Sequence, residues 1–286
     1  MGPCSIDDYD TALVYAEKLA CLSKLVEDRF FIVMRTFIEK SRSSLGWRGF
    51  LHDPDKDGSC NYEKGLFLSQ KLLDALTSLE MPAAVEIVDP FSLHLFKDEI
   101  SYGVIGARSC QSPSHRYLAS SCPFPIGFKN GTDGNIDSAI DAVKVATERH
   151  QMLSLNQEGN VHQTTSSGNP YPHVILRGGI HHSNFQKRYR DELMKSLPSS
   201  FLVDVSHGNC EKNCRRQIGS ALSLFHEMKE QKNPPRGIMI ESYLEEGCSH
   251  EPYKKGCSIT DPCLSWKTTE YLIQRGYEIL HTAPFA

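Results

Sequence analysis

The sequence lacks several features that would place the protein in a specialised class. No apolar run approaches the roughly 18 residues of a membrane span, and residues 1–8 have neither the basic start nor the apolar stretch of a secretory signal. Ten cysteines are scattered along the 286 residues without a CxxC pair, so a disulfide framework is less favoured than free thiols. We therefore expect a cytoplasmic protein that does not bind membranes.

An excess of positive charge is also missing. The chain has 31 Lys and Arg against 35 Asp and Glu, which gives a formal net charge of -4, so the composition does not predict nucleic-acid binding. With 40% hydrophobic and 23% charged residues, the composition is that of an ordinary globular protein. Any binding of anions must come from a local arrangement of side chains.

Short β-rich runs alternate with longer segments that have a helical period. This order is typical of repeated βα units around a parallel sheet. Leu72, Leu76 and Leu79 recur at helical spacing, as do Ile218, Leu222 and Phe225, and each set predicts one apolar helix face packed on the sheet. The predicted strands are 30–34, 83–87, 104–107, 125–128, 173–176, 201–205 and 237–241.

Charged side chains stand at or just after the ends of these strands. In a parallel α/β barrel all strand ends point to the same mouth, so residues far apart in sequence converge there. Four cations without partners would repel one another, and a multiply charged anion such as phosphate plus carboxylate would relieve this. Local salt bridges are the alternative, favoured for one such cation but not for four. The residues expected at the mouth are Arg35, Arg108, Lys129, Arg177, His207 and Glu241.

A second group of strand-end residues has the chemistry of metal ligands. Cys4, His207, Glu241 and Asp261 offer a thiolate, an imidazole and two carboxylates to a divalent cation. Each residue also has a simpler explanation: a small buried thiol, a hydrogen-bonded core histidine, an ion-pair partner and a turn or helix cap. No HExxH-type motif links the four, so their spacing leaves both interpretations open.

A series of motifs resembles the class I 3-deoxy-D-arabino-heptulosonate 7-phosphate synthases. They occur in the family's order over nearly the whole chain, and GFKNGTDG and SITD are the most specific. The motifs are GPCSI at 2–6, MR at 34–35, IGAR at 105–108, GFKNGTDG at 127–134, ILRGG at 175–179, SHGN at 206–209, MIES at 239–242 and SITD at 258–261.

The resemblance implies a (β/α)8 TIM barrel that makes up a single domain over residues 1–286. The family's N-terminal extension is missing from this sequence and only a stub of the first strand remains, so neighbouring strands should have partly unpaired edges. The implied reaction condenses phosphoenolpyruvate with erythrose 4-phosphate to give 3-deoxy-D-arabino-heptulosonate 7-phosphate and phosphate, the entry step of the shikimate pathway. It also implies one divalent metal ion, for which Mn, Fe, Co and Zn all suit the ligands.

The resemblance assigns roles to individual residues. It implies metal ligation by Cys4, His207, Glu241 and Asp261, and catalytic roles for Lys40, Arg35 and Lys129. It implies substrate binding by Arg35, Arg42, Ser43, Glu86, Gly106, Ala107, Arg108, Lys129 and Arg177, among which Arg42 and Ser43 take the phosphate of the aldose. The proton for the new alkoxide comes from Lys40 or from a metal-bound water, and the sequence does not choose.

Several departures from the family pattern lie near the aldehyde acceptor. The family's Lys-Pro-Arg-Thr reads Lys-Ser-Arg-Ser at 40–43, and proline replaces the usual residue at 113 and 262. These changes leave open a paralogue that uses another aldose phosphate, a non-catalytic homologue, or a truncated product without a stable fold. A homo-oligomer is also left open.

Overall fold

The computed structural model describes residues 1–156, 159–180, 182–230 and 234–281. The helices are α1 (Tyr9–Val26), α2 (Tyr62–Ser78), α3 (Pro90–Phe96), α4 (Pro113–Ser121), α5 (Asp137–Thr147), α6 (Lys187–Ser196), the 3-10 turn η1 (His207–Asn209), α7 (Arg216–Glu230) and α8 (Trp266–His281). The strands are β1 (Met34–Arg35), β2 (Ala83–Glu86), β3 (Ile100–Ile105), β4 (Ile126–Lys129), β5 (Gln151–Leu155), β6 (Val161–Thr165), β7 (His173–Leu176), β8 (Phe201–Asp204) and β9 (Gly237–Met239). No helix in the described part of the chain is long and apolar enough to cross a membrane.

Seven strands form one parallel sheet in the order β1-β2-β3-β4-β7-β8-β9. Each contains residues of one predicted strand. Two strands differ clearly from their expected bounds: β3 begins at Ile100 although 104–107 was expected, and at β1 only Met34 and Arg35 pair with a neighbour although the strand was expected over 30–34. Residues 30–33 line an apolar cavity instead, so their hydrogen-bonding edge has no neighbouring strand in the described structure.

The first two residues connect the two ends of this sheet. Arg35 N donates to Met1 O at 2.8 Å, and Gly2 N donates to Ile240 O at 3.3 Å. Ser242 N in turn donates to Gly2 O at 2.9 Å. A Cβ on Gly2 would lie 2.5 Å from Arg35 O, so only glycine allows this close approach. Residues 1–2 therefore link β1 to the segment after β9 at the carboxyl ends of the strands, and the predicted parallel α/β barrel is confirmed.

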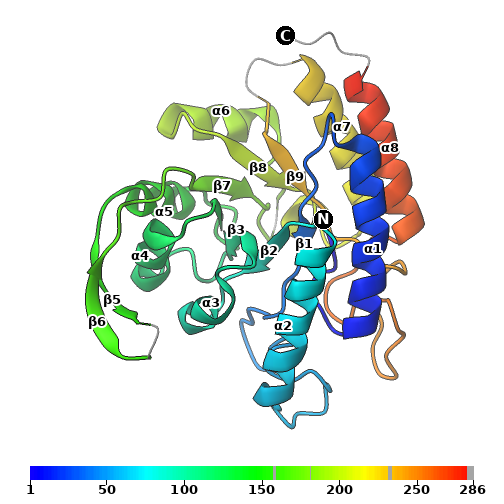
Figure 1. Cartoon of the computed structure of the whole chain (residues 1–286). Helices are drawn as coiled ribbons and strands as arrows, with labels where there is room; N and C mark the ends of the chain where they lie inside the picture. The colour runs from blue at the N-terminus through cyan, green and yellow to red at the C-terminus, as the bar shows by residue number, and fades with distance from the viewer. Residues whose placement is uncertain (157–158, 181, 231–233, 282–286) are drawn as a thin grey trace.

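The helices lie outside the sheet, and β5 and β6 form a separate antiparallel hairpin that extends away from it (Figure 1). The sequence did not predict this hairpin. β6 is mostly exposed and polar, and the apolar residues of β5, Met152, Leu153 and Leu155, do not alternate regularly with polar ones, so the alternation that marks a half-buried strand is missing. Backbone pairing between Gln151–Leu155 and Val161–Thr165 holds it together.

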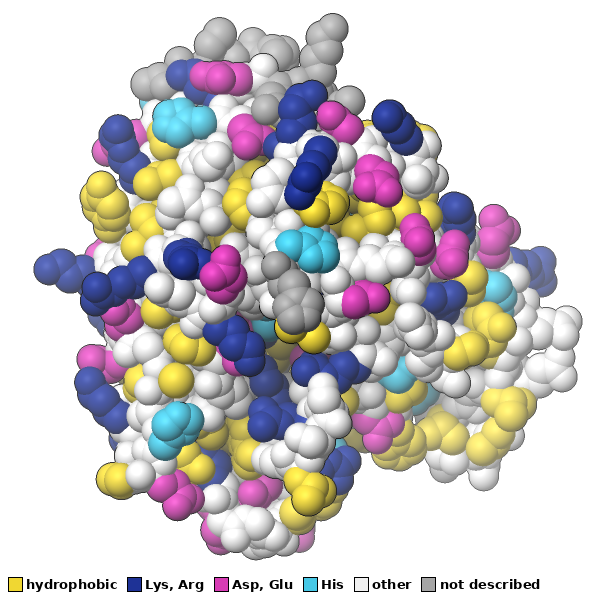
Figure 2. All heavy atoms as spheres, turned by 180° about the vertical axis from the view of Figure 1, so that it is seen from behind, with side chains coloured by type: hydrophobic (Ala, Val, Ile, Leu, Met, Phe, Trp, Pro, Cys, Tyr) yellow, Lys and Arg dark blue, Asp and Glu magenta, His cyan; other side chains and the backbone are white. Residues whose placement is uncertain are grey.

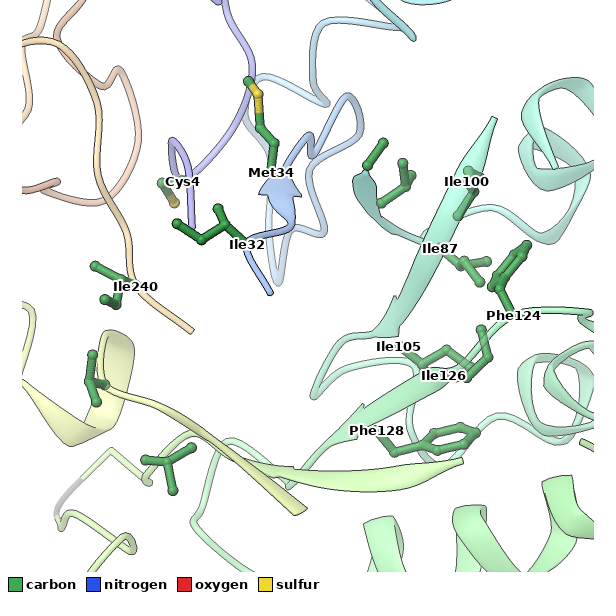
Figure 3. Close-up of a cluster of buried hydrophobic side chains, with 14 of the residues drawn as sticks. Cys4, Ile32, Met34, Ile87, Ile100, Ile105, Phe124, Ile126, Phe128 and Ile240 are labelled. Carbon is green, nitrogen blue, oxygen red and sulfur yellow. The ribbon is translucent and has the colours of Figure 1, made fainter. Parts of the chain in front are cut away.

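The core lies between the sheet and the surrounding helices. Strand residues such as Ile105, Ile126 and Phe128 are fully buried. Figure 3 shows them along adjacent strands, with Cys4 and Ile240 on the side where residues 1–2 close the ring. Leu72 and Leu76 are buried as expected on α2. On α7 the buried face is rotated slightly, to Gln217, Ala221, Leu224 and Phe225, while Ile218 and Leu222 pack at its border.

Candidate active site

The carboxyl ends of the strands carry a cavity of about 270 Å³ that is lined mainly by charged and polar side chains. Lys and Arg side chains gather around a hollow near the middle of the face in Figure 2. Most of the residues predicted for the site line this cavity. They are Arg35, Lys40, Arg42, Ser43, Glu86, Ala107, Arg108, Lys129, Arg177, His207 and Asp261.

The strands explain why these side chains meet. Arg35, Glu86 and Lys129 are the last residues of β1, β2 and β4, and Arg177 follows β7 directly. Because all these strands are parallel, their carboxyl ends open on the same side. Gly106 lies just below the cavity, where a Cβ would come 2.2 Å from Glu86 Oε1. Glycine at 106 therefore makes room for the Glu86 carboxylate.

Two of the four predicted cations are paired with a carboxylate, so the salt-bridge alternative holds for these two and not for the whole set of four. Arg35 Nη2 lies 2.9 Å from Glu241 Oε1, and Lys129 Nζ lies 2.8 Å from Asp204 Oδ2, with all four side chains buried. The fold brings these strand ends so close that each buried cation is neutralised by an anion from β8 or from the residues after β9. A buried ion would otherwise be costly.

Arg108 and Arg177 form the unneutralised part of the mouth. Among the described residues, no carboxylate lies within 4.0 Å of either guanidinium. Arg108 donates to Ser43 Oγ, and Arg177 Nη1 donates to Gly178 O at 3.1 Å. Burial lowers the pKa of Arg177 and of Lys129, in the case of Lys129 against the opposing effect of Asp204. This side of the mouth is ready to receive an anion.

Three of the four predicted metal ligands form a compact group. The ligand atoms of Cys4, Glu241 and Asp261 lie within 4.8 Å of one another. His207 is outside that group but borders it, because its Nε2 lies 3.4 Å from Glu241 Oε1. The group combines residues from distant parts of the chain, since Cys4 lies shortly after residues 1–2, which close the ring, and Asp261 precedes α8.

The donors in this group fit a divalent cation. Glu241 Oε1 is buried and receives no hydrogen bond, because Arg35 lies 2.9 Å away without hydrogen-bond geometry. Burial and the neighbouring Glu241 raise the pKa of the Cys4 thiol to about 11. Burial thus favours the neutral thiol, whereas a bound divalent cation would favour the thiolate, and a thiolate with two carboxylates and an imidazole is a common ligand set for such a cation.

Asp204 is a functional residue that the sequence reasoning missed. It is the fully buried last residue of β8, and its Oδ2 lies 2.8 Å from Lys129 Nζ and 2.9 Å from His207 Nδ1. Burial opposes its charge, yet Lys129 and His207 hold the pKa of Asp204 well below its usual range. This carboxylate brings Lys129 and His207 together, and Ser206 Oγ also lies 2.7 Å from His207 Nδ1. The signal was an acidic residue in an otherwise apolar strand.

The loop after β1 covers one side of the cavity. Lys40 Nζ lies 2.7 Å from Cys4 Sγ, while the Arg42 and Ser43 side chains are exposed at the rim. Burial opposes the charge of Lys40, but Cys4, Glu241 and Asp261 raise its pKa above the usual value. Lys40 is therefore protonated at neutral pH and lies next to the group of metal-binding donors.

Lys212 is a further cation of the mouth that the sequence reasoning did not select. Its Nζ lies 3.3 Å from Asp261 Oδ1, although most of its side chain is exposed. Lys212 follows η1 in a left-handed backbone conformation, with φ 58°. Such a turn redirects the side chain toward the cavity, and no sequence periodicity reports it.

The parallel ring of strands and the cationic mouth beside a carboxylate and thiol group define a barrel enzyme that acts on phosphorylated anions. Residues 1–274 match the model of the DAHP synthetase I family, and the chain belongs to this family.

The relatives and solved structures agree with this assignment. The chain is 42% identical over 281 residues to the Trp-sensitive phospho-2-dehydro-3-deoxyheptonate aldolase of Enterobacter agglomerans, with 96% of this chain and 81% of that protein covered. It is 40% identical to the Tyr-sensitive enzyme of Escherichia coli K12, with 98% and 81% covered. The structure of phospho-2-dehydro-3-deoxyheptonate aldolase from Francisella tularensis SCHU S4 superimposes with a TM-score of 0.95 at 38% identity, covering 99% of this chain and 85% of that one.

Proposed function

We propose that the protein condenses phosphoenolpyruvate with erythrose 4-phosphate to give 3-deoxy-D-arabino-heptulosonate 7-phosphate and inorganic phosphate. The observation that carries the proposal is the pair of unneutralised arginines, Arg108 and Arg177, beside Lys129 and the compact group of Cys4, Glu241 and Asp261. One part of the cavity suits a phosphate and a carboxylate, and the other suits a cation that activates an aldehyde. Family membership supports the same reaction.

In this proposal the cations of the mouth hold the enol phosphate. Arg108, Arg177 and Lys129 bind its phosphate and carboxylate. Arg35 donates to Pro3 O and Cys4 O at 3.0 Å each and lines the bottom of the cavity. The methylene carbon forms the new bond to the aldehyde carbon, and water adds to the carbon that bears the phosphate. Loss of phosphate from that carbon then gives the ketone. The fixed cations align the reactants and stabilise the leaving phosphate.

The residues Cys4, His207, Glu241 and Asp261 hold one divalent metal ion in this proposal. When bound, the metal polarises the aldehyde oxygen, because an enol phosphate is a weak nucleophile. The identity of the metal among Mn, Fe, Co and Zn is left to measurement, since the ligand set suits all four.

We propose Lys40 as the residue that supplies the proton to the new alkoxide. Its raised pKa keeps it protonated, and its Nζ lies beside Cys4 Sγ at 2.7 Å. Arg42 and Ser43, at the rim of the same loop, would bind the phosphate at the far end of the aldose. A bound aldose would then extend from the donors of the metal group to the loop.

The proposal extends to the setting of the reaction. The substrates are phosphoenolpyruvate and an aldose phosphate, and we place the protein in the cytoplasm, where these anions are made and used. We keep residues 1–286 as a single catalytic domain, and we assign it no nucleic-acid or membrane partner.

The test is phosphate release from phosphoenolpyruvate in the presence of each metal in turn. We expect release that needs both erythrose 4-phosphate and a divalent metal, and that a chelator abolishes. A panel of four-carbon and five-carbon aldose phosphates in the same assay defines the acceptor, because the 40–43 loop differs from the family pattern. No release with any aldose phosphate under any metal would refute the proposal.

A further inference from the structure

Glu39 carries a buried carboxylate directly before Lys40, outside the cavity. Its Oε1 lies 2.9 Å from His52 Nε2, and its Oε2 accepts a hydrogen bond from Ser92 Oγ at 2.6 Å. All three side chains are buried, and Glu39 is only 1% exposed. Because burying a carboxylate is costly unless its oxygens are hydrogen-bonded, these two contacts define where Glu39 can lie.

Glu39 joins three separate parts of the chain. His52 follows the loop that Glu39 precedes, and Ser92 lies in the first turn of α3. Ser92 Oγ also approaches Asp89 O at 2.8 Å, so this hydroxyl is held within α3. The carboxylate therefore ties both ends of the 40–48 segment to the connection between β2 and the next strand.

The backbone closes the base of this loop at the same place. Lys40 N donates to Arg48 O at 2.9 Å, and Leu51 N donates to Ile38 O at 2.9 Å. Gly49 has φ 110°, and a Cβ there would lie 2.7 Å from Glu39 Cα. The two arms of the loop are thus packed directly against each other at the backbone of Glu39, whose side chain is held by His52 and Ser92.

Above this base the loop makes few polar contacts with the rest of the protein. Within the described structure, Lys40 Nζ contacts Cys4 Sγ and Ser43 Oγ accepts a hydrogen bond from Arg108. Near its end, Trp47 Nε1 donates to Asp53 O and Arg48 Nη1 donates to the Tyr62 hydroxyl. Arg42, Ser44 and Leu45 are exposed, so the position of Arg42 depends mainly on the base of the loop.

We propose that Glu39, held by His52 and Ser92, is the positioning residue of the acceptor-binding loop 40–48. It does not touch the reactants, and it acts by holding the loop so that Lys40, Arg42 and Ser43 face the bound aldose phosphate. This inference rests on the proposed function for the identity of that ligand. The proposal predicts a selective effect: loss of the contacts of Glu39 with His52 and Ser92 weakens binding of the aldose phosphate much more than binding of phosphoenolpyruvate.

Ser92→Ala is the main variant, because it removes one hydrogen bond to the carboxylate and leaves the backbone of α3 intact. We expect the KM for erythrose 4-phosphate to rise about tenfold, as for a lost hydrogen bond to a charged group, while the KM for phosphoenolpyruvate changes less than about twofold. Ser92→Thr keeps the hydroxyl and should restore the KM. Ser120→Ala, another buried helical serine, whose Oγ contacts Ser166 Oγ at 2.7 Å, is the matched control.

Trp47 gives a readout that does not depend on activity. It lies in the loop, and its indole Nε1 donates to Asp53 O at 2.7 Å. In a Trp266→Phe background it is the only tryptophan, so acrylamide quenching reports the order of the loop. We expect quenching to increase in Ser92→Ala and in Glu39→Gln, and to stay unchanged in Ser120→Ala.

The outcomes separate the two proposals. An equal rise in both KM values, or unchanged KM values and quenching with only a lower melting temperature, would show that Glu39 is a structural residue and would overturn the inference. If the wild-type protein releases no phosphate while quenching still increases in both variants, the anchor of the loop stands and the proposed function fails.

Discussion

The two ends of the barrel are built from the same strands but differ in chemistry. At the carboxyl ends lies the charged cavity of about 270 Å³, and at the amino ends lies a larger cavity of about 360 Å³ lined mostly by apolar side chains such as Phe30, Ile32 and Phe225. Arg35 lies between them and lines both. The residues that line the larger cavity include no carboxylate, histidine, lysine or cysteine among those described, so its size does not mark it as the site of chemistry. What distinguishes the active end is the convergence of charges from separate strands.

The largest difference between the two ends should appear when a charge is removed from the mouth. Lys129→Met leaves Asp204 buried beside His207 without its main cation and, under the proposed function, removes a contact to phosphoenolpyruvate. We expect kcat/KM for phosphoenolpyruvate to fall about a thousandfold. The measurement is phosphate release, with circular dichroism to check folding. Lys195→Met, an exposed lysine on α6, is the control and should keep full activity. Retention of a tenth or more of the activity would contradict the assignment of Lys129.

A substitution at the opposite end should change stability and leave binding alone. Phe225 is 1% exposed, and its ring lies 5.4 Å from that of Phe30. Phe225→Ala enlarges the apolar cavity and should lower the free energy of unfolding by about 3–5 kcal/mol. The measurement is urea denaturation, combined with the KM for phosphoenolpyruvate at a temperature where the variant is folded. A changed KM there would show that the two ends are coupled.

Two buried carboxylates sharpen the comparison. Asp204 is paired with Lys129 and has a lowered pKa, whereas burial raises the pKa of Asp7 to about 6 despite the nearby Lys56. The folded state then favours protonated Asp7, so its stabilising contribution is present below about pH 4 and is lost as pH rises through 6.

Asp7→Asn tests this difference. Because the variant cannot ionise, it should be more stable than wild type by about 1–3 kcal/mol at pH 7, and the gain should disappear near pH 4. Thermal unfolding across this range gives the result. Equal gains at both pH values would mean that ionisation of Asp7 is not the cause.

The smallest effect is expected at the rim of the mouth. The Lys212 side chain is largely exposed, and its ion pair with Asp261 is screened by water. Lys212→Ala should change kcat/KM by no more than about threefold. Initial rates at low and high salt provide the measurement, and a loss like that of Lys129→Met would show that Lys212 belongs to the catalytic group.

The fold was predictable because each buried strand leaves a short β-rich run in the sequence. All seven strands of the sheet were found in this way, and the resemblance supplied the closed ring. The bounds were less certain, as β1 shows: strand 30–34 was expected from its residues, but pairing depends on a neighbour that residues 30–33 do not have. The β5–β6 hairpin was missed because exposed polar residues carry no periodic signal.

The sequence predicted which residues belong to the site better than it predicted which carboxylate pairs with which cation. Strand ends indicate which side chains face the mouth, so Arg35, Lys129 and Arg177 were found from the residues alone. Which anion faces which cation depends on the register between strands, and this is why the Lys129–Asp204 pair was missed. The resemblance placed Lys40 and Arg42, because a loop has no period from which to read its direction.

The way in which the ring is closed has a consequence for substitutions near Met1. The amine of Met1 donates to Val33 O at 2.7 Å, and burial with Arg35 nearby lowers its pKa to about 5. Met1 and residues 30–33 line the apolar cavity beside β9. Because Met1 O also accepts a hydrogen bond from Arg35 N at 2.8 Å, a substitution at Met1 or Val33 should be judged by its effect on both stability and activity.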